Sequence, residues 1–201
     1  QKEYSKSTKK YDAVRRCTKG YSCKFVAKEK LKHIVSKEAF NIDGLGKKVI
    51  EQFWDLGLVK EPSNIFKLDY DKISKLEGWG KLSINNLKKA VNDSQLITLD
   101  RFIFSIGIRH IGQENAKIMA SFFSSIKEFT KLLDSKSRKK LLTNLVDLDG
   151  IGETQIESIN SFFSNETNTK IIKDLINKLN ITDYITKSIN GKFSNKKLMF
   201  T

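Results

Sequence analysis

The 201-residue sequence lacks several features that would assign it to common protein classes. It has two cysteines and one proline, and it has no apolar run of the length that a membrane span requires. So few cysteines exclude a disulfide-stapled scaffold, and the basic but polar N-terminal segment excludes a secretory signal. We therefore expect a soluble, cytoplasmic protein with no membrane span.

Acidic residues are also scarce relative to basic ones. The chain has 23 Asp and Glu against 37 Lys and Arg, which gives a formal net charge of +14. Its 39% hydrophobic content is enough for a buried core. The positive surplus favours a nucleic acid or an anionic membrane surface as partner and disfavours a cationic ligand.

Strand signals are rare, and apolar residues recur at steps of three and four over residues 28–178, as in Val49, Ile50, Phe53 and Trp54. This spacing predicts short helices joined by glycine-bearing turns. Strands are expected only near the ends, at 11–16 and 197–201. The predicted fold class is mainly α.

A short glycine-containing motif recurs four times along the chain. Its second glycine is Gly46, Gly80, Gly112 or Gly152, at steps of 34, 32 and 40 residues. The positions four and one before it, and four and seven after it, are all apolar. The residues four before it are Ile42, Leu76, Ile108 and Leu148, and those one before it are Leu45, Trp79, Ile111 and Ile151. The residues four after it are Ile50, Ile84, Ala116 and Ile156, and those seven after it are Phe53, Leu87, Met119 and Ile159. The pattern predicts a helix, a tight turn and a second helix packed on the first.

Such a turn exposes bare backbone and the free N–H groups of a helix start, which can bind a phosphate oxygen. One turn of this kind suits an ordinary helical bundle, whereas four in register in a basic chain favour binding to a nucleic-acid backbone. The third turn departs from the pattern because His110 replaces its first glycine. The fourth lies between Asp149 and Glu153 and is the weakest candidate. The candidate contacts are Gly44, Gly46, Lys47, Lys48, Gly78, Gly80, Lys81, Arg109, His110, Gly112, Gly150 and Gly152.

Three other features have competing interpretations. Cys17 and Cys23 are spaced as in a metal-binding knuckle, but a structural zinc needs four ligands, so the residues alone favour free thiols or a local disulfide. His33 is interpreted as an ordinary helix residue rather than a ligand. Trp79 is expected in the core rather than stacked on a ligand, and the basic run 135–140 is expected to be solvated rather than phosphate-bound.

The four turns resemble the helix-hairpin-helix motif, in a tandem domain of the RuvA domain 2-like (SAM-like) kind. From about residue 11 to 201, the cysteine pair followed by HIVSKEAFNIDGLG, LEGWG, SIGIRHIGQENAK and LDGIG resembles the C-terminal half of bacterial NAD-dependent DNA ligases. The resemblance implies half of a four-cysteine zinc finger at 1–27, with Cys17 and Cys23 as zinc ligands. It also implies a helix-hairpin-helix DNA-binding domain at 28–179, and a linker with the first BRCT strand at 180–201.

The same resemblance implies a role in gripping duplex or nicked DNA across the minor groove, as a monomer, within an enzyme that seals nicks during replication and repair. No K-x-D-G motif is present, so no catalytic residue is expected in this stretch, and NAD and magnesium would serve only the full-length enzyme. Two alternatives remain: the DNA-holding module of a repair nuclease or junction-binding protein, and a helical scaffold that docks another protein.

Overall fold

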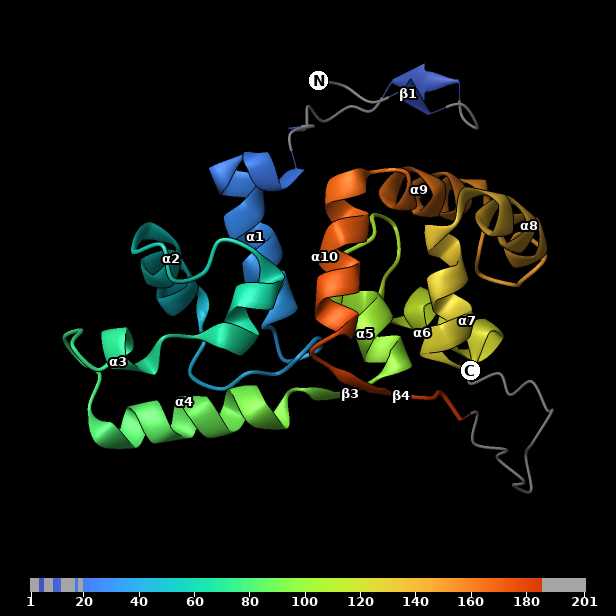
Figure 1. The fold of residues 1–201 in the computed structure, drawn as a ribbon. Coiled ribbons are helices and arrows are strands. Elements are labelled where there is room, and N and C mark those ends of the chain that lie inside the picture. Colours follow the sequence, from blue (N-terminus) through green and yellow to red (C-terminus); the bar gives the residue numbers. More distant parts are fainter. Residues whose placement is uncertain (1–3, 6–8, 12–16, 18–19, 186–201) are drawn as a thin grey trace, which may run out of the picture.

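The computed structural model describes residues 4–5, 9–11, 17 and 20–185, and helices dominate this part of the chain, as expected (Figure 1). The ten α-helices within it are α1 (Lys24–Ile34), α2 (Lys47–Asp55), α3 (Tyr70–Ile73), α4 (Lys81–Asp93), α5 (Leu99–Ser105), α6 (Gln113–Phe123), α7 (Ile126–Phe129), α8 (Ser135–Leu145), α9 (Glu153–Phe163) and α10 (Glu166–Ile176). Three short 3-10 helices accompany them: η1 (Gly20–Ser22), η2 (Pro62–Lys67) and η3 (Thr130–Leu133). No helix in the described ranges is both long enough and apolar enough to cross a lipid bilayer.

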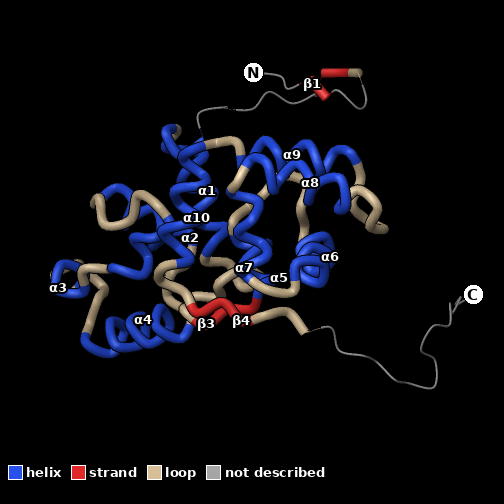
Figure 2. The backbone as a smooth tube through the Cα atoms, turned by 45° about the vertical axis from the view of Figure 1, so that its right-hand side comes forward, coloured by secondary structure: helices blue, strands red, loops and turns tan. Residues whose placement is uncertain are grey.

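The helices form two groups on either side of α10 (Figures 1 and 2). One group contains α1 to α4 and the other contains α5 to α9, while α10 contacts η2 of the first group. A chain of edge-to-face phenylalanines holds the second group together. The Phe129 ring of α7 lies 6.2 Å from that of Phe102, 5.4 Å from that of Phe123 and 5.6 Å from that of Phe163. The two groups of helices correspond to the first two and the last two glycine turns.

The repeated apolar positions are confirmed as core. Eleven of the sixteen are buried, and the other five, Leu76, Trp79, Ile84, Leu148 and Ile156, are half-buried and packed against the core. In α4, for example, Leu87 and Val91 face inward at a spacing of four residues. The period in the sequence therefore identified the inward face of each second helix.

The leading helices are less regular than the repeat predicts. Only the third and fourth turns are preceded by helices of several turns, α5 and α8. The second turn follows the four-residue helix α3, and turn structure at 35–40 separates α1 from the first turn. The expectation of a regular helix before every turn is wrong for these two hairpins.

The strands also differ from the sequence-based expectation. β3 (Leu96–Thr98) pairs in parallel with β4 (Asn180–Thr182), and Tyr184 N–H donates a hydrogen bond to the Ser124 carbonyl. The packed chain therefore continues beyond 179, where a linker was expected to begin. Near the start, β1 (Tyr4–Ser5) pairs antiparallel with β2 (Lys10–Tyr11). The rest of the strand expected at 11–16, and all of the one expected at 197–201, lie outside the described residues.

The expected division at 27/28 falls within α1, where Ala27 is fully buried. α1 is therefore continuous with the helical domain from Lys24 onward. The three-domain division itself remains a prediction.

Candidate nucleic-acid interface

All four turns have the same backbone geometry. In each, a residue with positive φ sits third in a four-residue turn, and the fourth residue donates its N–H to the carbonyl of the first. The φ values are +87° at Gly44, +83° at Gly78, +61° at His110 and +92° at Gly150. This is the conformation of a type II turn, for which glycine is the favoured residue. The third turn keeps the geometry with histidine in the strained position, and Asn115 Nδ2 donates to the His110 carbonyl at 3.2 Å.

The backbone conformation at the second glycine of each motif does not itself require glycine. Gly46, Gly80 and Gly112 have φ values of −66°, −86° and −83°, which any residue can adopt. A Cβ atom added to any of these three would meet nothing within 4 Å. No contact within the described structure therefore requires glycine at these three positions, although glycine is among the residues favoured at a helix N-cap.

These glycines are also the N-caps of the helices that follow. Among the other helices, α3, α7, α8 and α10 begin with Asp, Asn or Ser side chains that accept a backbone hydrogen bond, whereas the N-cap side chains of α1 and α5 accept none. At α2, α4 and α6 no side chain does so, and the glycine N–H donates to no acceptor in the described part of the chain. Each of these three helix starts thus presents unsatisfied N–H groups at the positive end of a helix dipole.

The first two turns belong to one reciprocally packed unit. A methyl group on Gly44 would lie 3.5 Å from Leu87 Cδ1 of α4, so the first turn rests on the second hairpin. In return, the Trp79 ring of the second turn lies 5.5 Å from the Phe53 ring of α2. Each turn therefore buttresses the second helix of the other hairpin. Trp79 is half-buried against this core, which confirms its predicted place.

Basic side chains lie beside the first three turns. Lys47, Lys48 and Lys81 are exposed at the starts of α2 and α4, and His110 is exposed in the third turn, while Arg109 is half-buried and makes other contacts.

The two acids of α2 are paired with lysines of α1. Lys32 of α1 lies 2.6 Å from Glu51, and Lys28 lies 2.8 Å from Asp55. Hydrogen bonds from these lysines lower the pKa of each carboxyl below its ordinary value.

The fourth turn has the same backbone geometry but differs at its helix start. The Gly152 N–H donates to Gln155 Oε1 at 3.2 Å, so a side chain of the same helix already occupies the position that a phosphate oxygen would take. A Cβ on Gly150 would lie 2.8 Å from Ile118 Cδ1 of α6, so the fourth turn lies against the third hairpin. Glu153 is exposed at the position where α2 and α4 begin with Lys47 and Lys81. This turn is built as a contact between the third and fourth hairpins.

The basic run at 135–140 is not uniformly solvated. Arg138 is buried, and its guanidinium donates to the carbonyls of Leu132 at 3.0 Å and Phe163 at 2.9 Å. It also donates to Asn160 Oδ1 and Ser164 Oγ, each at 3.2 Å. The expectation of a solvated run is wrong at this position, because Arg138 ties α8 to the end of α9.

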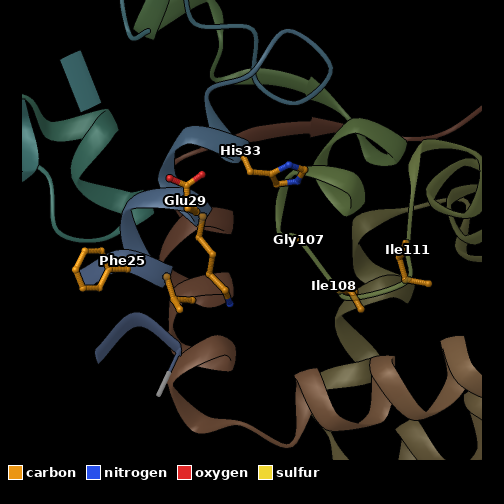
Figure 3. A pocket seen from close by; sticks show the side chains of 8 residues that line it. Phe25, Glu29, His33, Gly107, Ile108 and Ile111 are labelled. Atoms are coloured by element: carbon orange, nitrogen blue, oxygen red, sulfur yellow. The ribbon is translucent and has the colours of Figure 1, made fainter. Parts of the chain in front are cut away.

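An open pocket lies between α1 and the third hairpin (Figure 3). Its lining is mostly apolar, with Phe25, Ile108 and Ile111 among its residues. His33 also lines it, and its Nε2 lies 2.9 Å from the Phe104 carbonyl while its ring packs edge-on against that of Phe104 at 4.7 Å. His33 is thus a packing residue, as interpreted from the sequence.

The two cysteines supply only part of a metal site. Cys17 is exposed and Cys23, the N-cap of α1, is half-buried; neither forms a disulfide. Within the described residues no group of three or more His, Cys, Asp or Glu side chains converges as metal ligands would. A tetrahedral zinc site requires four ligands, so the donor set present here does not fit a complete zinc site.

With this geometry in place, comparison with known proteins identifies the class. A helix-hairpin-helix motif model matches residues 101–172, which span the third and fourth hairpins. The chain therefore contains a helix-hairpin-helix motif over these residues.

Relatives along the whole sequence are more specific. The chain is 50% identical over its full length to a DNA ligase of Pelagibacter ubique. It is 43% identical over 94% of its length to a DNA ligase of Wolbachia pipientis and 38% identical over 96% to one of Neorickettsia sennetsu. The chain spans about 29% of the length of each of these proteins. It is therefore homologous, from end to end, to one segment of a DNA ligase.

Proposed function

We propose that this chain binds duplex DNA through its phosphate backbone and without sequence specificity. The observation that carries the proposal is the set of three helix starts at Gly46, Gly80 and Gly112, whose glycines have no steric reason within the described structure and whose amides have no acceptor there. A phosphate oxygen supplies both the acceptor and the close approach. Backbone amides position DNA but carry no base readout.

The charge of the chain supports the same partner. Lys47, Lys48, Lys81 and Arg109 stand beside these helix starts, within a chain of net charge +14. We assign the phosphate contacts to the first three turns, with Gly44, Gly78 and His110 shaping them. Gly150 and Gly152 of the fourth turn are assigned to packing, because Gln155 and Ile118 already occupy their surroundings.

In the whole protein, this segment would hold DNA while other parts seal a nick using NAD. The homology to DNA ligases favours this setting over a repair nuclease or junction-binding protein. The sequence contains no K-x-D-G lysine for adenylate transfer, so the segment by itself would neither adenylate nor ligate. Cys17 and Cys23 would contribute two thiolates to a zinc site completed by ligands from elsewhere in the protein.

The test is a binding titration of the chain with intact and nicked duplexes of two unrelated sequences at low salt. We expect binding to all of them, with similar affinity for the two sequences. Failure to bind any duplex at low salt would instead favour a scaffold that docks another protein. A strong preference for one sequence would contradict binding through backbone amides.

A further inference from the structure

The second turn continues into an exposed helix face with an unusual composition. Leu82, Asn85, Asn86 and Lys89 follow Gly80 along α4 at the spacing that places side chains on one side of a helix. All four are exposed, and Leu82 is 75% exposed although it is a large apolar residue. We call these four residues the α4 face.

The polar members of the α4 face have no intramolecular role in the described structure. The side chains of Asn85, Asn86 and Lys89 form neither a hydrogen bond nor an ion pair with any described residue, and residues 81–92 include no acid. The second helices of the neighbouring hairpins differ. The acids of α2 are paired with lysines of α1, and Glu114 of α6 is paired with Lys117 at 2.7 Å.

The borders of the face limit its extent. Asp93 is the last residue of α4. A groove between α4 and the first turn is lined by Asp93 and Asp43 as well as by Asn86 and Lys89. A polyanion would therefore contact the N-terminal part of α4, close to the second turn, and turn away before the aspartates. This part runs from Leu82 to Lys89, which lies about one turn before Asp93.

We propose that duplex DNA held by the second turn lies along the α4 face, as an extension of the function proposed above. Leu82 packs against deoxyribose and base edges, the amides of Asn85 and Asn86 hydrogen-bond in the groove, and Lys89 contacts a phosphate. The chemistry fits a nucleic-acid groove, where amides, cations and apolar wedges are the residue types that make contact. The absence of acids over these residues gives the charge complementarity that a polyanion requires.

The experiment compares single variants of the chain in duplex binding across a salt series. Leu82→Ala should weaken binding by roughly 3- to 10-fold through lost apolar contact. It should leave the slope of log affinity against log salt unchanged, because no phosphate contact is removed. Lys89→Ala should make that slope shallower by about 0.9, because it removes one phosphate contact. Asn85→Ala combined with Asn86→Ala should weaken binding at constant slope.

Leu56→Ala is the matched control. Leu56 is 52% exposed and lies at the C-terminal end of α2, so its truncation should leave affinity unchanged. Thermal melting should show each variant folded, because every substituted residue is exposed and alanine favours helices.

Two outcomes separate this inference from the function on which it rests. If Gly80→Asp abolishes binding while every α4-face variant binds like the wild type, the α4 proposal fails and backbone binding stands. If the wild type itself does not bind duplex at low salt, both fail, and the α4 face would instead be open to a protein partner.

Discussion

Replacing Gly46, Gly80 and Gly112 together by aspartate should make the protein more stable and unable to bind DNA. This prediction separates a role in binding from a role in folding, because the two measurements are expected to move in opposite directions. All three glycines are N-caps with φ between −66° and −86°, and their Cβ positions are open. Aspartate therefore fits without rearrangement.

The gain in stability follows from helix capping. Aspartate at an N-cap accepts an N–H bond of the first turn and places negative charge at the positive end of the helix. Together the three substitutions should raise the free energy of unfolding by about 1 to 3 kcal/mol. The melting temperature should rise by a few degrees for a domain of this size.

The loss of binding follows from the same geometry. Each carboxylate occupies the position of a phosphate oxygen, removes the hydrogen bonds to it and repels it. A hydrogen bond to a charged group contributes about 1.5 to 3 kcal/mol, so three sites together exceed the roughly 4 kcal/mol that corresponds to a thousandfold change. We expect at least a hundredfold loss, because such contributions are not fully additive.

The assay is fluorescence anisotropy of a labelled duplex, with thermal melting on the same samples. The control carries the same charge change at N-caps outside the glycine turns: Thr98→Asp, Ser125→Asp and Asn165→Asp at α5, α7 and α10. This control variant should lose only the small part of the DNA affinity that depends on net charge. A triple glycine variant that melts at or above the wild-type temperature and still binds DNA as tightly as the wild type would refute the reasoning.

Three further predictions concern other parts of the chain. Gly152→Asp should leave duplex affinity within about twofold of the wild type in the same anisotropy assay, since Gln155 already satisfies that amide. Arg138→Met should lower the free energy of unfolding by about 2 to 4 kcal/mol in denaturant melts, because it orphans buried carbonyls, whereas exposed Lys139→Met should change it little. The lysines of α1 lower the pKa of Glu51 and Asp55, so these carboxylates stabilise the fold at neutral pH and lose that effect as the pH falls through their depressed pKa values. Glu51→Gln with Asp55→Asn should therefore flatten the loss of stability below about pH 4 in melts over a pH series.

Sequence periodicity was sufficient to predict the core and the turns. The repeat around Gly46, Gly80, Gly112 and Gly152 identified both the apolar face of each second helix and the position of each turn. This worked because every copy must satisfy the same two constraints, a tight turn and a packed helix. Where the copies differ chemically, as at Glu153 and Gln155, the sequence indicated only that the fourth copy was weaker.

The features that sequence reasoning missed depend on partners far apart in the chain or on side-chain direction. β3 and β4 are three residues each and separated by more than eighty residues, too short for an alternating pattern to show. Gln155 caps its own turn only because its side chain folds back, although Gln three residues after an N-cap is a recognisable capping-box signal. Arg138 resembled its lysine neighbours, but its planar guanidinium can satisfy several carbonyls at once where an ammonium cannot.

The most direct test of phosphate binding by the three turns is the salt dependence of duplex affinity. It is measured for the wild-type chain and for the single variants Gly46→Asp, Gly80→Asp and Gly112→Asp. With roughly four to six phosphates neutralised, log affinity should fall linearly with log salt at a slope of about −4 to −5. Each single variant should have a shallower slope than the wild type. A wild-type slope near zero, or the same slope in all four proteins, would contradict the assignment of the three turns as phosphate sites.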